Sequence, residues 1–183
     1  MFVKAGELGL NVLTALLSQS VEEVASKIKL YRDARARHAH DPDTGRVTLM
    51  LHTFVGKEEQ TVVDITRGPL SEYLNAHVGL IETMTQSLDI KLDINKEQYL
   101  DSLIDFALER YYHIASLIGT PQKCLPLVNR LRDIGVDELA CFIDFGVQVD
   151  AVLDALRPLH ELKELSETAV PKQNSQLARS KSA

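Results

Sequence analysis

The chain has 183 residues, of which 45% are hydrophobic and 25% charged, and its formal net charge is −6 at pH 7. This composition predicts a soluble domain with a substantial core, and the lack of a basic stripe argues against a nucleic-acid partner. No apolar run approaches the roughly 18 residues of a membrane span, and the N-terminus has no secretory signal, so we expect a cytoplasmic protein.

Helical and strand patterns alternate from the N-terminus. Residues 2–9 read as the last turns of a helix closed by Gly9, and residues 11–17 (NVLTALL) form the short apolar run of a buried strand. Residues 20–23 (SVEE) form a capping box, in which the serine accepts from the third amide while the glutamate reaches back. A helix to about His38 is therefore predicted.

The middle of the chain predicts a strand and then a long helical excursion. Residues 46–55 (RVTLMLHTFV) are rich in β-branched residues and predict a strand. Residues 57–87 are mostly helical, with a break or kink at Gly68-Pro69 because proline cannot donate to the preceding turn. Residues 89–98 predict an exposed connection, and residues 99–118 predict a further helix that ends in a loop.

The clearest local signals begin at Thr120, which can cap a helix whose first residue is Pro121. Gly135 can take the left-handed conformation that closes this helix. Residues 139–143 (LACFI) have no polar residue at alternate positions, which indicates a parallel strand covered on both faces by helices. Asp144 follows at the carboxyl end of that strand, where α/β folds bind their ligands.

A last amphipathic helix begins at Val149, and residues 166–183 predict a disordered polar tail. The order of elements is β/α alternation, so we predict an α/β fold with parallel strands and right-handed crossovers. Cys124 and Cys141 are predicted to be small buried hydrophobes. The histidines show no spacing typical of metal ligands, so no metal site is expected.

Three separated blocks of the sequence, in the same order, resemble the C-terminal part of bacterial-luciferase-like, flavin-dependent monooxygenases. The likeness is strongest to the subgroup associated with nonribosomal peptide and polyketide assembly lines. It extends over residues 2–165, which we treat as one domain portion. The blocks are residues 6–35 (GELGLNVLTALLSQSVEEVASKIKLYRDAR), residues 46–56 with 67–74 (RVTLMLHTFVG, RGPLSEYL) and residues 119–146 (GTPQKCLPLVNRLRDIGVDELACFIDFG).

The resemblance implies a (β/α)₈ TIM barrel that binds reduced FMN and uses O₂ to oxygenate an organic substrate in secondary metabolism. It places this chain at about strands six to eight with their helices and the family's long insertion. Three strands cannot close a barrel, because a closed one needs eight. By the same resemblance, the residues that would contact the flavin are Thr14, Leu16, Gln19, His52 and Asp144. Tyr111 and Tyr112 would lie near the substrate.

Each of these side chains also has a structural interpretation. Asp144 could cap a loop, His52 could be a hydrogen-bonded core histidine, and the tyrosines could pack in the core. The implied partners are flavin, a small-molecule or carrier-bound substrate, and the missing N-terminal half or a homologous subunit. The subgroup often has histidine where Ala15 stands and glycine where Ser18 stands. This departure supports the alternative of a non-catalytic truncated remnant or a partner-dependent interaction module.

Overall fold

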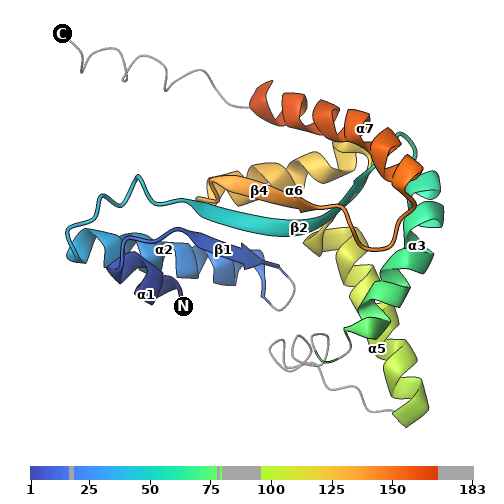
Figure 1. The fold of residues 1–183 in the computed structure, drawn as a ribbon, viewed down its shortest axis with the longest axis horizontal. Coiled ribbons are helices and arrows are strands. Elements are labelled where there is room, and N and C mark those ends of the chain that lie inside the picture. Colours follow the sequence, from blue (N-terminus) through green and yellow to red (C-terminus); the bar gives the residue numbers. More distant parts are fainter. Residues whose placement is uncertain (17–18, 78, 80–95, 169–183) are drawn as a thin grey trace.

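The computed structural model describes residues 1–16, 19–77, 79 and 96–168. Helices pack around a parallel sheet, so the α/β prediction is confirmed (Figure 1). The elements in chain order are α1 (Phe2–Glu7), β1 (Val12–Ala15), α2 (Val21–Arg37), β2 (Val47–Val55), α3 (Glu59–Ala76), α5 (Lys96–Arg110), the π-helix η1 (Tyr111–Ala115), β3 (Leu117–Gly119), α6 (Pro121–Asp133), β4 (Glu138–Phe142) and α7 (Val149–Thr168).

The strand β2 is the centre of the sheet, and every strand pairs with it in parallel. β1 and β4 pair with the first part of β2, whereas β3 pairs with its last residues, from Thr53 opposite Leu117 to Val55 opposite Gly119. Within the described residues, β1 and β4 have no further partner strand. The sheet is therefore open, in agreement with an incomplete barrel.

The predicted helix boundaries rest on hydrogen bonds that the structure contains. The Ser20 hydroxyl accepts from the Glu23 amide at 3.2 Å, and the Glu23 carboxylate accepts from the Ser20 amide at 2.6 Å. The Thr120 hydroxyl accepts from the amide of Lys123 at 3.3 Å. Gly135 closes α6 with a φ of +93°, a conformation that glycine adopts without a steric penalty.

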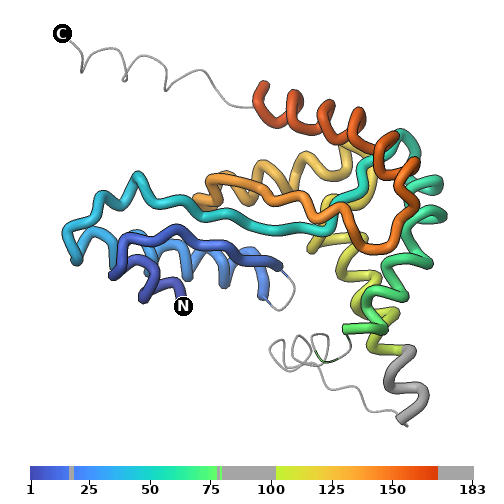
Figure 2. The backbone as a smooth tube through the Cα atoms, viewed as in Figure 1, coloured from blue at the N-terminus to red at the C-terminus, as the bar shows by residue number. Residues whose placement is uncertain are grey.

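Alternate residues of β2 pack into two separate cores. Leu49, Leu51 and Val55 pack with α2, α6 and α7 in what we call the helix-layer core. Phe54 packs with α3, α5 and η1 in a second core. The backbone trace shows α3 and α5 together beyond the carboxyl end of β1, away from α1 and α2 (Figure 2). The long excursion after β2 thus covers one end of the sheet rather than extending the helix layer.

Of the break or kink predicted at Gly68-Pro69, the break is wrong, because α3 is continuous from Glu59 to Ala76. Proline removes one hydrogen bond from the helix interior, which ordinarily disfavours helix. Here Val62, Leu70 and Leu74 are at most 1% exposed on one face of α3. Burial of this face against the second core offsets the lost hydrogen bond.

Two further predictions of secondary structure need correction. Residues 117 and 118 are predicted at the end of a helix, but they form β3 with Gly119, because the helical region ends at Ala115 and the chain turns to pair with β2. Of the predicted connection 89–98, residues 89–95 lie outside the described residues, and residues 96–98 already belong to α5. Residues 169–183 also lie outside them, after α7 ends at Thr168.

Cys124 is buried as predicted, whereas Cys141 is exposed. The reason is the position of β4, which pairs with β2 on one side only and leaves its own residues half-buried or exposed. The apolar pattern of β4 therefore does not produce the expected cover on both faces. An apolar strand at the edge of an open sheet is a surface that a further chain segment can bury.

Candidate functional site

The face of the sheet opposite the helix layer carries the candidate site. Registered residues of parallel strands point to the same face, and His52 is paired with Phe142. One step earlier, Met50 is flanked by two small residues, Ala15 and Ala140. This face therefore has a row with two small side chains at Met50, next to the rings of His52 and Phe142. Figure 1 shows that this end of the sheet adjoins α3 and α5.

His52 lies inside a group of aromatic rings that we call the His52 cluster. The centroid of its ring lies 4.8 Å from that of Tyr73, 4.9 Å from those of Tyr111 and Phe142, and 5.6 Å from that of Phe145. All four contacts are edge-to-face, a geometry that aromatic pairs favour. His52, Tyr111 and Phe145 are buried, whereas Tyr73 and Phe142 are only half-buried.

The environment of His52 keeps its imidazole neutral. Burial in the cluster, with a smaller contribution from His77, lowers its pKa from 6.5 to about 4. The Nε2 atom is buried and has no hydrogen-bond partner among the described residues. An unpaired buried nitrogen costs free energy, and a ligand that hydrogen-bonds to it regains that cost.

Tyr111 and Tyr112 are adjacent in the sequence but point to different places. Burial raises the pKa of the Tyr111 phenol, with a further contribution from Tyr73, so Tyr111 is an uncharged wall of the His52 cluster. The Tyr112 hydroxyl lies 2.9 Å from the hydroxyl of Thr66 on α3. Only Tyr111 therefore meets a residue predicted for the flavin pocket.

The residues predicted at the end of β1 form a local network. The Gln19 amide donates from Nε2 to the Thr14 hydroxyl at 2.8 Å and to the Ala15 carbonyl at 2.5 Å, and its Oε1 accepts from Lys27 at 2.7 Å. Thr14 is registered with Leu49 and Leu16 is buried in the helix-layer core, so both side chains lie on the face opposite His52. Between the predicted flavin contacts Leu16 and Gln19, residues 17 and 18 lie outside the described residues.

Arg110 was missed by the sequence analysis. Its Nη2 donates to the main-chain carbonyl of Leu16 at 3.2 Å and to that of Gln19 at 2.8 Å. These bonds link the last residue of α5 to the end of β1, a relationship that no spacing in the sequence indicates. The adjacent Tyr111 enters the His52 cluster, so one short segment contacts both parts of the candidate site.

Asp144 is exposed two residues beyond β4, whereas the next residue, Phe145, is buried against His52. Phe145 belongs to the second core, together with Tyr111. The loop after β4 thus contributes to the His52 cluster through Phe145 and not through Asp144, the residue that was predicted. The one sequence signal for Phe145 was its position in this loop.

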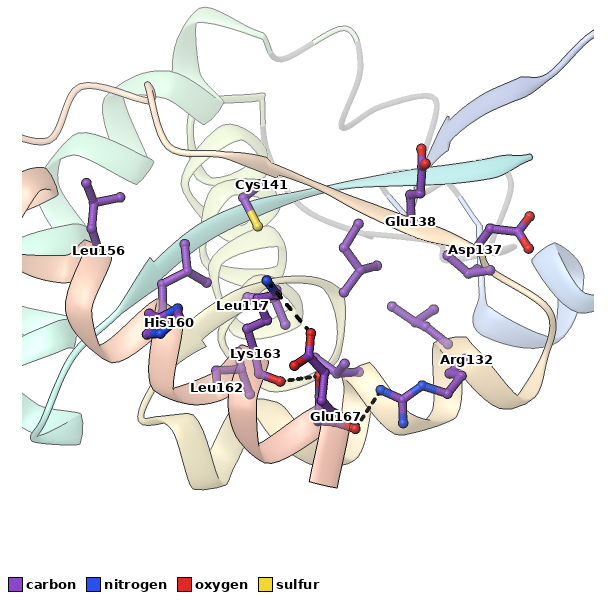
Figure 3. Close-up of a pocket in the computed structure, with 16 residues that line it drawn as sticks. Leu117, Arg132, Asp137, Glu138, Cys141, Leu156, His160, Leu162, Lys163 and Glu167 are labelled. Atoms are coloured by element: carbon purple, nitrogen blue, oxygen red, sulfur yellow. Dashed lines mark hydrogen bonds and ion pairs between the residues drawn. The ribbon is translucent and has the colours of Figure 1, made fainter. Parts of the chain in front are cut away.

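A cavity of about 680 Å³ lies on the other side of the sheet, between β4, α6 and α7 (Figure 3). Its floor includes Leu131 and Leu162, and Cys141 points into it from β4. Arg132 and Lys163 line it too, but Arg132 donates to the Ser166 carbonyl at 2.8 Å and Lys163 pairs with Glu167 at 3.7 Å. None of its lining residues belongs to the His52 cluster.

Within the described residues, no group of three or more His, Cys, Asp and Glu side chains could hold a metal ion. None of the helices described is both long and apolar enough to cross a membrane.

The family model of luciferase-like monooxygenases matches residues 1–138. The chain belongs to the luciferase-like monooxygenase family. A search of curated protein sequences found no match.

Several solved structures share the fold of this chain at low sequence identity. The monooxygenase RslO1 from Streptomyces bottropensis is 15% identical with a TM-score of 0.57, covering 87% of this chain and 43% of its own. The coenzyme F420-dependent tetrahydromethanopterin reductase from Methanopyrus kandleri is 14% identical with a TM-score of 0.57, and the match covers 85% of this chain and 46% of the reductase. A third match is the oxygenating constituent of 3,6-diketocamphane monooxygenase from Pseudomonas putida, solved with FMN. It is 16% identical with a TM-score of 0.52, and the match covers 90% of this chain and 43% of the monooxygenase.

These comparisons establish the fold and leave the cofactor open. At such low identity a structural likeness carries the arrangement of the chain rather than its chemistry. The chain spans less than half the length of each solved relative. The relatives bind FMN in one case and depend on coenzyme F420 in another.

Proposed function

We propose that this chain supplies the C-terminal portion of an FMNH₂-dependent monooxygenase that oxygenates an organic substrate in secondary metabolism. The observation that carries the proposal is the His52 cluster, because an unpaired buried nitrogen lies on β2 beside the last residue of β4. Ligands of parallel α/β folds bind at the carboxyl ends of strands. The family match and the sequence likeness to assembly-line monooxygenases favour flavin and a small or carrier-bound substrate.

The residues on this face fit a flat, largely uncharged ring system. Ala15 and Ala140 leave Met50 as the only large side chain of the row next to His52. The neutral His52 can offer one hydrogen bond at Nε2 without bringing a charge into the pocket. The Gln19 side chain fits less well, because its nitrogen and oxygen already bond to Thr14, Ala15 and Lys27.

Bound FMN would supply the redox chemistry with O₂, and the residues of this chain would bind and orient the ligands. His52 would hold a carbonyl or a ring N–H through Nε2, depending on the tautomer. Tyr111 and Phe145, both 3% exposed, would keep water away from that hydrogen bond. A hydrogen bond in a dry site is stronger than one in water, which favours a fixed orientation of the ligand.

An anaerobic titration tests this proposal. The purified 183-residue chain is titrated with reduced FMN and, separately, with reduced coenzyme F420, and binding is followed by equilibrium dialysis. Saturable binding of FMN that weakens about tenfold in His52→Phe supports the proposal, since a hydrogen bond in a dry site is worth roughly 1.4 kcal/mol or more. Binding of F420 alone would transfer the proposal to a deazaflavin enzyme, and binding of neither would contradict it for this chain.

The open sheet favours a second candidate, an interaction module that acts only with a partner. Leu13 on β1 is 63% exposed on the face that carries Met50, and both β1 and β4 lack a second partner strand among the described residues. Exposed apolar surface and free strand edges promote association. Self-association measured by sedimentation should decrease in Leu13→Lys if this face is the contact, and equal association of both proteins would exclude it.

A further inference from the structure

Three consecutive residues at the junction of α5 and η1 point to three different parts of the molecule. Arg110 bonds to the end of β1, Tyr111 enters the His52 cluster, and Tyr112 bonds to α3. The π-helix begins at Tyr111, and its wider turn changes the angle between successive side chains relative to an α-helix. Short π-helical turns are frequent at functional sites.

The connection between the two parts of the site is short and tightly held. From the Arg110 guanidinium, two hydrogen bonds of 3.2 and 2.8 Å reach the carbonyls of Leu16 and Gln19. One residue later the Tyr111 ring lies 4.9 Å from that of His52. At the far end of η1, the Ser116 hydroxyl donates to the Tyr111 carbonyl at 2.5 Å. Tyr111 is therefore fixed from both sides.

The charge of Arg110 is directed at main-chain oxygens rather than at a carboxylate. Desolvation lowers the pKa of its guanidinium, while Tyr111 and Glu23 act in the opposite direction. Its Nε is buried and has no hydrogen-bond partner among the described residues. The guanidinium of Arg110 thus bonds to two carbonyls while one of its buried donors stays unpaired, which costs free energy.

We propose that Arg110 is a positioning residue that couples the end of β1 to the His52 cluster through Tyr111. This inference rests on the proposed function and deepens it. It assigns the residues through which ligand binding at the end of β1 affects the His52 cluster. A ligand that displaces the Leu16 and Gln19 carbonyls alters their hydrogen bonds with Arg110. Movement of Arg110 then shifts the ring of the adjacent Tyr111. The ligand class is the flat, uncharged ring system proposed above.

The test compares Arg110→Gln and Arg110→Lys with Arg67→Gln in the full chain. Arg67 is the matched control, since it is an exposed arginine that bridges α3 to Asp105 of α5 at 3.8 Å and lies outside the site. Two quantities are measured without any ligand: amide exchange of residues 12–16 and 19–24, and the NMR shifts of the His52 and Tyr111 rings.

In Arg110→Gln we expect exchange in these segments to rise by about tenfold, the effect of losing hydrogen bonds to a charged group, together with a displacement of the His52 and Tyr111 resonances. Arg110→Lys should restore part of both effects, and Arg67→Gln neither. Faster exchange with unchanged ring resonances would overturn the coupling and leave Arg110 a local tether. Unchanged exchange would overturn the inference altogether.

A titration with reduced FMN separates the failure of this inference from failure of the proposed function. If the unaltered chain binds FMN and Arg110→Gln weakens binding while its unfolding midpoint matches that of Arg67→Gln, the coupling serves ligand binding. If FMN binds equally to both variants, the coupling claim is wrong although the proposed function stands. If FMN does not bind at all, the proposed function fails, and the ring resonances alone decide the coupling.

Discussion

His52 and Phe142 are register partners on neighbouring parallel strands, and their rings meet edge to face with 4.9 Å between centroids. This pair places a buried imidazole at the end of the sheet where α3 and η1 arrive. Because the Nε2 atom of His52 has no partner among the described residues, the pair defines both the rigid wall of the candidate site and its polar contact.

The stability of the chain should depend on pH through His52. Its folded-state pKa of about 4 lies below the ordinary 6.5, so the unfolded chain takes up a proton first as the pH falls. The free energy of unfolding is unaffected by His52 above about pH 6.5 and falls by up to about 1.4 kcal/mol per pH unit between there and pH 4. Urea unfolding across this range should show this fall in the unaltered chain and in His113→Gln, and a smaller fall in His52→Phe.

Gly6 of α1 should not tolerate a side chain. A Cβ on Gly6 would lie 2.5 Å from the Tyr31 carbonyl oxygen of α2, so Gly6→Ala forces the helices apart and should cost roughly 1–3 kcal/mol. Thermal unfolding measures this loss, and an unchanged unfolding midpoint in Gly6→Ala would contradict the close approach of α1 and α2.

The Tyr112–Thr66 hydrogen bond should give a measurable coupling. Thr66 is fully buried, so Thr66→Val leaves the Tyr112 hydroxyl without its partner and should cost about 1–3 kcal/mol. Tyr112→Phe removes that hydroxyl, and the double variant should be more stable than the sum of the single effects predicts. A double-mutant cycle by urea unfolding measures this, and strict additivity would show that the contact contributes nothing.

The cap of α6 should matter more for its oxygen than for its methyl group. Thr120→Ala removes the acceptor for the Lys123 amide and should cost about 1 kcal/mol, whereas Thr120→Ser keeps that acceptor and should cost little. Denaturant unfolding compares the two. Equal losses would mean that the Thr120 methyl group, rather than the cap, carries the stabilisation.

Local signals allowed much of the fold to be predicted. The helix caps Ser20 and Thr120 each act over three residues, and both hydrogen bonds are present in the structure. Pro69 failed as a signal, because burial of the α3 face depends on α5, which comes much later in the chain. β3 failed for a similar reason, since three residues become a strand only through pairing with β2.

The site could be predicted only where one residue at a strand end sufficed. His52 and Tyr111 were both singled out, and the structure brings their rings together. Arg110, Tyr73 and Phe145 were not, because their roles depend on which helix returns to which strand end. The placements of Thr14 and Leu16 on the helix-layer face follow from strand register, which a sequence pattern alone does not specify.

The histidine NMR spectrum under titration with reduced FMN tests the central claim most directly. His113 and His160 are exposed and lie outside the His52 cluster, and His160 lines the cavity between β4, α6 and α7, so one spectrum reports on both the cluster and the cavity. We expect a saturable shift of the His52 resonance with His113 and His160 unchanged. A shift of His160 with His52 unchanged, or no shift at all, would contradict it.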